Sequence, residues 1–478
     1  MKTRKARLFA CAALAVAGLC GAGPLAGEAA ASQHQIVFFD ATNLLLNGRT
    51  RASTFRTLQH EGVSALRVLL YWQAISPYSH SKRLPRGLKL TEPGSYNFVP
   101  YLQILQKAKK LGWKVLLTPT GPAPRWATAG HRGYLYAPSA KLFEDFVTAA
   151  AKALGPYVDY WGIWNEPNEV FELQPQWKGN GAPASPGIYR ALYLAAYRGL
   201  QAAGISRPDI LFGELSPYGA SSVNPRREGT MHSMAPLTFL RAALCLNGSY
   251  RPVGRCAPLP VSGIAIHPYP MGASPLYVPP NPDQVTLASL GRLERAINLA
   301  VRAHRLSAHV PIYITEYGIN TKPNPAGVSP QQQAQEVAFS EMLAWENGWV
   351  ASFAQYELRD DAIPRHLPRG YTGFQTGLEY ANGRPKALYY SYPVPLVVTR
   401  SGRGYRLWGY IRPAHRATSA TVLIQRSPHA RFTVLARVHA GPLGYFTLRS
   451  SVSGVAWKLR WVSPAGLRYE GVPVGVSP

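Results

Sequence analysis

Acidic residues are scarce in this chain. Its 478 residues include 24 Asp and Glu against 51 Lys and Arg, which gives a formal net charge of +27. Charged residues make up only 16% of the chain, too few for a disordered protein, and the hydrophobic share of 46% can build a sizeable core. The length leaves room for one large domain and a small one. Because carboxylates are so few, a glutamate that follows a buried apolar run stands out.

The chain also lacks a convincing membrane span. The apolar stretch from Leu8 to Gly21 is too short and too interrupted by glycine to predict one. Basic residues precede this stretch, and the small residues Ala29-Ala30-Ala31 follow it, which is the pattern of a secretory signal peptide. We therefore expect residues 1–31 to be removed near Ala31 and no transmembrane segment to remain. The mature protein is then secreted and extracellular, where it could associate with the cell wall.

Cysteine is nearly absent, with four residues in the whole chain. Cys11 and Cys20 leave with the predicted signal peptide, so only Cys245 and Cys256 remain. Two cysteines this close together in an exported protein predict a disulfide that closes a loop. No histidine stands at ligand spacing beside them, so the pair does not indicate a metal site.

Removal of the signal peptide takes away four basic residues and one acidic residue, which leaves a net charge of +24 from +27. A charge this large outside the cell predicts attraction to anionic polymers such as wall polysaccharides. Nucleic acid is the other usual partner of such charge, and the export signal argues against it. The alternative is that the surface is basic and simply solvated.

Short apolar segments alternate with amphipathic ones from Ile36 to about Tyr390. Eight strands interleaved with helices predict an α/β fold, a (β/α)₈ TIM barrel. A doubly wound sheet would show the same alternation, but here polar residues suited to chemistry follow several strands, and in a barrel these strand ends meet at one mouth. The expected strands are Ile36–Phe39, Ala65–Leu70, Lys114–Thr118, Tyr157–Ile163, Ile210–Phe212, Gly263–Ile266, Ile312–Thr315 and Ala351–Ala354. The expected helices are Thr50–Glu61, Val99–Leu111, Ala140–Ala153, Pro186–Ala203, Pro236–Leu246, Pro282–His304 and Pro330–Asn347, with starts at Ser185-Pro186, Asn281-Pro282 and Ser329-Pro330.

Beyond Tyr390 the pattern becomes short alternating strands separated by Gly, Pro and Ser, which predicts a small all-β sandwich. We therefore divide the mature chain into a barrel domain, residues 32–390, and a sandwich domain, residues 391–478. From Arg400 to the end the chain holds eleven arginines, Lys458 and a single acid, Glu470. This basic domain either docks to an acidic polymer or packs against the barrel and shields it. The expected strands are Leu407–Ile411, Ala420–Gln425, Phe432–His439, Gly444–Leu448 and Ala456–Val462.

Two glutamates, 150 residues apart, each follow a buried strand of the expected barrel. Glu166 lies in Trp164-Asn165-Glu166-Pro167-Asn168, and Glu316 lies in Ile314-Thr315-Glu316-Tyr317-Gly318. Cleavage of a glycosidic bond needs such a pair, because a neutral acid must protonate the leaving oxygen while an ionised carboxylate faces the sugar carbon.

These two motifs resemble those of the clan A retaining glycoside hydrolases, which are built on (β/α)₈ barrels with the acids on strands four and seven. The resemblance extends from about Ile36 to Tyr390 and is closest to cellulase-like and beta-xylosidase-like families. It implies that Glu166 is the acid/base and Glu316 the nucleophile. A retaining site places the two carboxyl groups about 5 to 5.5 Å apart.

The resemblance also implies supporting residues. Asn165 would hydrogen-bond the sugar 2-hydroxyl. Arg67 is a charge in the apolar run Ala65–Val68 and is expected to pair with a carboxylate and keep Glu316 ionised. His267 would line the mouth, and Tyr269 would hold Glu316 through its hydroxyl. The alternatives are a structural ion pair for Arg67 and a core histidine at position 267.

Aromatic side chains are candidates for a platform on which a sugar ring stacks. Trp126 is the first choice, followed by Tyr71 and Trp72, with Tyr317 beside the nucleophile; each is as well explained by core packing. The chain departs from the clan on the eighth strand, where a tryptophan is usual. It reads Phe353-Ala354-Gln355-Tyr356-Glu357 there, followed by further charged residues, which argues against an ordinary glucose or xylose substrate.

We therefore predict a secreted hydrolase of O-glycosyl bonds that acts on a poly- or oligosaccharide and needs no metal or organic cofactor. A transglycosylase acting on wall polymers would use the same site. An inactive carbohydrate-binding protein is the third possibility, although a binder has no use for two carboxylates in this position. The sequence leaves open the sugar, the anomer, exo or endo action and the oligomeric state.

Overall fold

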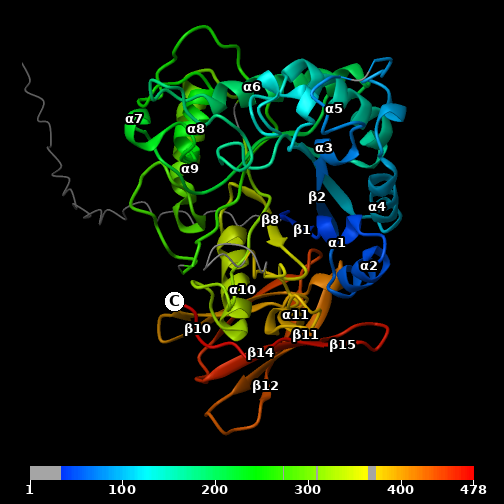
Figure 1. Ribbon diagram of the computed structural model, residues 1–478. Helices are drawn as coiled ribbons and strands as arrows, with labels where there is room; N and C mark the ends of the chain where they lie inside the picture. Colours follow the sequence, from blue (N-terminus) through cyan, green and yellow to red (C-terminus); the bar gives the residue numbers. More distant parts are fainter. Residues whose placement is uncertain (1–33, 85, 273, 308–309, 364–372) are drawn as a thin grey trace, which may run out of the picture.

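The chain folds into a closed barrel of parallel strands followed by a β-sandwich (Figure 1). This computed structural model describes residues 34–84, 86–272, 274–307, 310–363 and 373–478; the predicted signal peptide lies outside them. The predicted TIM barrel and sandwich are both confirmed. The eight barrel strands among the described residues are β1 (Ile36–Asp40), β2 (Ala65–Tyr71), β3 (Lys114–Thr120), β4 (Tyr160–Gly162), β5 (Ile210–Leu215), β6 (Gly263–Ile266), β7 (Ile312–Ile314) and β8 (Val350–Tyr356).

Each barrel strand pairs in parallel with the next, and β8 closes the ring against β1. In that last pairing Asp40 is level with Tyr356, the final residues of the two strands. Helices surround the strands, as Figure 1 shows. The longer helices are α2 (Arg51–His60), α4 (Val99–Lys110), α5 (Ala140–Leu154), α6 (Ser185–Ala202), α8 (Pro236–Ala243), α9 (Leu290–Arg302) and α10 (Pro330–Glu346), and the shorter ones are α1 (Thr42–Leu46), α3 (Trp72–Ile75), α7 (Pro225–Glu228) and α11 (Ala387–Ser391).

The interior of the barrel is filled with side chains. One buried cluster takes residues from most of the strands, including Phe38, Leu116 and Tyr313. Towards the other end the interior becomes polar, and Gly162 on β4 makes room there. A Cβ at Gly162 would lie 2.4 Å from a carboxylate oxygen of Glu214 and 2.4 Å from the hydroxyl of Thr118. Because a Cβ at this position would clash with both side chains, glycine on β4 makes room for the buried carboxylate of Glu214.

Two of the three predicted helix starts, Ser185-Pro186 and Ser329-Pro330, agree with the structure, and the third is wrong. Ser329 caps α10 by accepting a hydrogen bond from the backbone N–H of Gln332. Ser185 is already the first residue of α6, and its hydroxyl donates to Gln176 instead. The helix expected from Pro282 begins only at Leu290, after a 3₁₀ turn. The intervening Asp283 is held by Arg241 of α8, so tertiary contacts override the local start signal.

The C-terminal strands form two antiparallel sheets, in the orders β13-β10-β9 and β12-β11-β14-β15. The strands of the predicted sandwich are present, and the sequence interpretation missed the first and last of them. The strands are β9 (Leu396–Ser401), β10 (Gly404–Tyr410), β11 (Thr418–Gln425), β12 (Thr433–Ala440), β13 (Tyr445–Ser450), β14 (Ala456–Val462) and β15 (Arg468–Glu470).

The sandwich packs beneath the barrel, against α10 and α11 (Figure 1). The buried guanidinium of Arg412 donates to Glu341 of α10 at 2.8 Å, and its charge lies over the ring of Tyr392. Trp345 of α10 packs against Trp408 of β10. Charged and aromatic contacts of this kind tie the two domains together. In the described part of the chain, no helix has the length and apolar character needed to cross a membrane.

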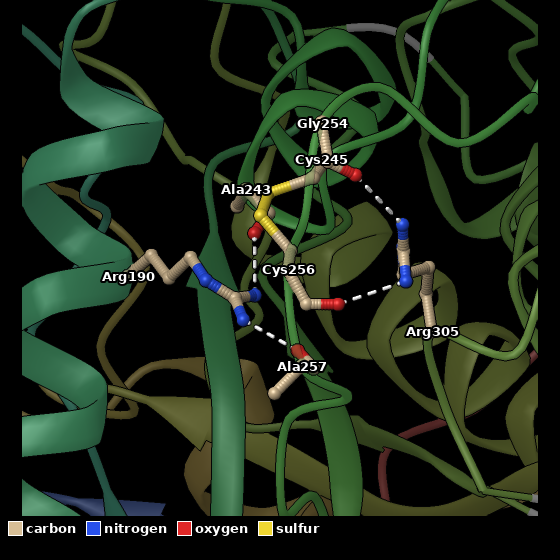
Figure 2. Close-up of a disulfide and its surroundings, with 7 residues drawn as sticks. All are labelled: Arg190, Ala243, Cys245, Gly254, Cys256, Ala257 and Arg305. Carbon is tan, nitrogen blue, oxygen red and sulfur yellow. Dashed lines mark hydrogen bonds between the residues drawn. A yellow bond between two sulfur atoms is a disulfide. The ribbon is translucent and has the colours of Figure 1, made fainter.

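The predicted disulfide between Cys245 and Cys256 is present, with Cα atoms 6.2 Å apart. Figure 2 shows an arginine on either side of it, Arg190 from α6 and Arg305 from the segment after α9. Each guanidinium donates to two backbone carbonyls of this region, those of Ala243 and Ala257 for Arg190 and those of Gly254 and Cys256 for Arg305. The bridge and the two arginines hold the β5–β6 connection to the helical layer.

Replacing both cysteines with serine is expected to lower the free energy of unfolding by about 3 kcal/mol, because the cross-link restricts the unfolded chain. Denaturant titration of the wild type and the double variant measures the difference. A reducing agent should destabilise the wild type by a similar amount and leave the variant unchanged. Equal unfolding midpoints for all samples would contradict the prediction.

Candidate active site

Glu166 and Glu316 meet at the mouth of the barrel formed by the carboxyl ends of its strands. Glu166 follows β4, and Glu316 lies two residues beyond the end of β7. In a closed parallel barrel these ends share one rim, where enzymes of this architecture place their sites. One carboxylate oxygen of each glutamate and a ring nitrogen of His267 all lie within 4.8 Å of one another. The Glu166 side chain is 21% exposed and that of Glu316 is 9% exposed, so both can be reached from the mouth.

Both oxygens of Glu316 accept hydrogen bonds. Arg67 donates from Nη1 to Oε2 at 2.7 Å, and the Tyr269 hydroxyl donates to Oε1 at 2.8 Å. The expected pairing of Arg67 with a carboxylate and the expected contact between Tyr269 and Glu316 are therefore both present. Donors on both oxygens fix the orientation of the carboxylate.

Arg67 is fully buried and has several acceptors. Besides Glu316, it donates to Asp40 at 2.8 Å, to Glu214 at 2.7 Å and to the side-chain carbonyl of Asn165 at 2.6 Å. Burying a guanidinium is costly unless it is paired, and here three carboxylates surround it. Their charges outweigh the loss of hydration and raise the pKa of Arg67 well above its usual range. The side chain is thus a permanent positive charge at the centre of the site.

The sequence interpretation missed Asp40 and Glu214. Glu214 lies in the apolar strand β5, accepts a hydrogen bond from Thr118 at 2.8 Å, and its backbone carbonyl accepts from the N–H of Glu166 at 3.1 Å. Asp40 ends β1. An ionisable residue within an apolar run was the signal that singled out Arg67, and the same signal could have found both acids.

The environments of the two glutamates differ. Burial raises the pKa of Glu166 to about 7. Burial also raises the pKa of Glu316, while the charge of Arg67 opposes that rise. Arg67 contacts Glu316 directly and not Glu166, so Glu166 is the carboxyl that is more easily kept protonated.

His267, at the end of β6, lies between the two acids. Its Nδ1 is 2.8 Å from Oε1 of Glu166 and 3.8 Å from Oε2 of Glu316, and its Nε2 is 3.1 Å from the hydroxyl of Thr315. Burial lowers the pKa of His267 to about 4, so the ring is neutral at neutral pH. A neutral imidazole adds no charge to the site and can share a proton with Glu166.

Three non-glycine residues of the site have left-handed backbone conformations. The φ angles are 64° for Trp164, 38° for Glu166 and 54° for Glu214. Such residues cost on the order of 1–3 kcal/mol each and gather at functional sites. The Trp164 indole N–H donates to the carbonyl of Glu172, which helps to hold this backbone.

Most of the aromatic candidates lie in the core. Trp72 and Tyr317 are fully buried, and Trp126 is nearly so. Trp72 stacks on Phe146, and the Tyr317 hydroxyl is 2.8 Å from that of Ser340. The expectation that these three rings stack on a sugar does not fit their burial, because dense packing leaves no face open.

Tyr71, at the end of β2, is the candidate that keeps some exposure. A second partly exposed residue is Tyr356, the last residue of β8. A cis peptide bond joins Tyr356 to Glu357. These two phenol rings are thus the aromatic candidates that remain at the mouth.

Glu166, His267 and Glu316 also form the one group among the described residues whose ligand atoms are close enough to share a metal ion. Two carboxylates and an imidazole are ligands that several divalent cations accept. Glu316 is already held by Arg67, whose positive charge would oppose a cation in the same place.

Sequence comparison finds no family model and no curated protein that matches this chain. Solved structures do match. A glucosidase from Croceicoccus marinus aligns with a TM-score of 0.50 at 10% identity, over 88% of this chain and 93% of its own. A family 39 glycoside hydrolase from Bacteroides cellulosilyticus WH2 aligns with a TM-score of 0.49 at 13% identity, over 87% of this chain and 80% of its own. A beta-xylosidase from Caulobacter crescentus aligns with a TM-score of 0.48 at 15% identity, over 88% of this chain and 95% of its own. At these identities the similarity to the glucosidase establishes a shared fold.

Proposed function

We propose that the protein is a retaining glycoside hydrolase in which Glu316 is the nucleophile and Glu166 the acid/base. The observation that carries the proposal is the separation of the two carboxylates. The nearest oxygens of the two carboxylates lie within 4.8 Å of each other, which fits a retaining site, where the carboxyl groups are roughly 5–5.5 Å apart and not the roughly 6.5–9.5 Å of inverting sites. The fold that the chain shares with a glucosidase also supports the proposal of a glycoside hydrolase.

The proposed reaction has two steps. The Glu316 carboxylate attacks the anomeric carbon while the bond to the leaving oxygen breaks, and Glu166 gives that oxygen its proton. Water then loses a proton to Glu166 and attacks the same carbon, which breaks the ester to Glu316 and restores its carboxylate. The donors from Arg67 and Tyr269 favour the ionised form of Glu316, as the first step requires.

The side-chain carbonyl of Asn165 already has a hydrogen-bond donor. Its carbonyl accepts from Arg67, so the amide N–H₂ is turned away from the guanidinium. In the proposed mechanism this N–H₂ donates to the 2-hydroxyl of the bound sugar, a contact that strengthens in the transition state. Arg67 therefore orients both the nucleophile and the residue that contacts the sugar.

The rate on aryl glycosides should fall as the pH rises through about 7. Glu166 must be protonated to act as an acid, and a pKa of about 7 means that it loses this proton there. The rate should also fall at low pH, where Glu316 becomes protonated. The pH profile of kcat/KM for the wild type and for Glu166→Gln measures both the fall at high pH (the upper limb) and the fall at low pH (the lower limb).

The variant should lose the upper limb and keep the lower one, because glutamine does not titrate. An unchanged rate between pH 6 and 9 in the wild type would contradict the role of Glu166. Product analysis with water alone and with added sugar acceptors separates hydrolysis from transglycosylation.

We also propose that the mature protein is secreted and that its sandwich domain binds anionic polymers. Several arginines there are exposed, and none of them forms a salt bridge with a described acid; they are Arg426, Arg431, Arg437 and Arg449. Binding to anionic and neutral wall polymers at two salt concentrations tests this, because electrostatic binding weakens as salt rises. Binding that is insensitive to salt would contradict it.

A further inference from the structure

Glu357 is a buried carboxyl for which no residue in the described part of the chain provides a partner. It follows Tyr356 at the mouth end of β8 and exposes only 9% of its surface. Its Oε1 is buried without a hydrogen-bond partner, and no described residue donates to its other oxygen. Asp40, Glu214 and Glu316 are buried as well, but each of them pairs with Arg67. An unpaired buried carboxyl costs several kcal/mol, so its retention calls for a partner from outside.

This carboxyl lies at the same end of the barrel as the nucleophile, because Glu357 follows β8 and Glu316 follows the neighbouring strand β7. Tyr356, its neighbour in the chain, is level with Asp40 across the β1–β8 pairing. The ring of Tyr356 packs on Phe374, which packs in turn on Tyr269, the residue that holds Glu316. The charges of Asp40 and Glu316 both act on Glu357. A group that pairs with Glu357 can therefore belong to the same sugar that Glu316 attacks.

A second carboxyl at the mouth also lacks a cation. Glu172, in the loop after β4, is partly exposed and lies next to Asn165. Among the described residues, no Lys or Arg forms a salt bridge with it. Burial and the charges of Glu166 and Glu316 raise its pKa to about 8. Carboxyls without a described counter-ion thus follow both β4 and β8.

The buried basic side chains near the mouth that the structure describes do not have a free positive charge. Arg67 serves three carboxylates, and His267 is neutral at neutral pH. Lys386 is buried and pairs with Asp360 at 2.7 Å. The mouth is therefore locally anionic in a chain whose net charge is +27. A positively charged ligand would remove this imbalance.

We propose that the sugar bound beside Glu316 carries a free, protonated amino group and that Glu357 is its counter-ion. The substrate class is a glycoside of an amino sugar that is not N-acetylated. An ammonium group supplies three N–H donors and a charge, which is what an unpaired buried carboxyl lacks. N-acetylation removes the charge, and a hydroxyl in the same place offers a weaker partner. This inference rests on the proposed glycosidase function and names its substrate.

Binding should release a proton. Burial and the neighbouring acids raise the pKa of Glu357 to about 10, so the free protein holds it protonated at pH 7. An ammonium group in contact favours the ionised form, and the proton leaves to the buffer. The measured binding enthalpy then depends on the ionisation enthalpy of the buffer, which a purely structural role of Glu357 would not produce.

The test is isothermal titration of the full-length mature protein with methyl glycosides. The panel is methyl 2-amino-2-deoxyglucoside and methyl 6-amino-6-deoxyglucoside in both anomers, with methyl glucoside and the N-acetylated 2-amino compound as neutral controls. We expect at least one amino compound to bind tenfold or more tightly than both neutral ones and to release a proton. Glu357→Gln should reduce that preference at least tenfold and abolish the buffer dependence. Glu228→Gln, an exposed acid on α7, is the matched control and should change neither.

Equal binding of amino and neutral sugars by the wild type would overturn the inference, as would a preference that survives in Glu357→Gln. If that variant fails to fold, the buffer dependence of the wild type still decides. Hydrolysis of the matching aryl glycosides is measured separately. Preferred binding without hydrolysis of any member would refute the glycosidase and leave the amino-sugar site standing, whereas hydrolysis without preference would do the reverse.

Discussion

Replacing Glu316 with glutamine is expected to lower kcat on any accepted aryl glycoside by about 10⁴-fold or more. Glutamine has nearly the same shape and can still accept from Arg67 and exchange a hydrogen bond with Tyr269, so the fold should be kept. What it loses is the negative charge that forms the bond to the anomeric carbon. Initial rates and the unfolding midpoint, measured together, separate loss of chemistry from loss of structure.

The matching variant of Glu166 should behave differently. Loss of a general acid typically costs about 10²–10⁴-fold, and the cost shrinks when the leaving group needs no proton. Glu166→Ala should therefore retain more activity on a dinitrophenyl glycoside than on a methylumbelliferyl one, and added azide should restore turnover by attacking the glycosyl-enzyme. If both variants keep wild-type rates on every accepted substrate, the assignment of the pair is wrong.

The fold could be predicted from the sequence because its signals are local. Each barrel strand is a short apolar run, and each neighbouring helix has its own apolar face, so the alternation is visible without knowing any long-range contact. Helix starts are less local. The start expected at Pro282 fails because Asp283 is bound by Arg241 from a helix about 40 residues earlier, and no local pattern encodes that contact.

Only part of the centre of the site could be predicted from the sequence. Glu166 and Glu316 were found because motif and strand position agree, and Arg67 because a charge interrupts an apolar run. The number of carboxylates around Arg67 depends on which strand ends the barrel brings together, and this is a property of the closed sheet. The stacking candidates failed for a related reason. The sequence around a tryptophan such as Trp72 does not indicate whether its ring faces a sugar or packs on Phe146.

We also expect removal of the Arg67 guanidinium to destabilise the mouth. It is fully buried, and its partners Asp40, Glu214 and Glu316 are nearly so. Replacing Arg67 with methionine nearly keeps the volume of the side chain but leaves three carboxylates without their cation. Removal of one partner from a buried ion pair typically costs about 3–5 kcal/mol, so we expect a loss of at least that size in the free energy of unfolding. Denaturant titration against the wild type measures it.

The pH dependence of Arg67→Met distinguishes this cause from a packing defect. Burial already raises the pKa of Glu316 and Arg67 opposes that rise, so the pKa must go further up in the variant. A carboxyl whose folded-state pKa is raised binds more protons folded than unfolded, and stability then falls as pH rises through that range. The variant should therefore be less destabilised at pH 5 than at pH 8. A packing defect would give the same loss at both values.

Two further variants complete the comparison. Arg67→Lys keeps the charge but reaches fewer acceptors than the forked guanidinium, so its loss should lie between those of the wild type and Arg67→Met. Arg198→Met breaks an exposed ion pair with Glu144 and should cost no more than about 1 kcal/mol. If Arg67→Met were as stable as Arg198→Met at pH 8, the carboxylates at the mouth would have to be neutral without Arg67. That result would contradict the expected cost of removing Arg67, and with it the assignment of Arg67 as the cation that holds these three carboxylates ionised.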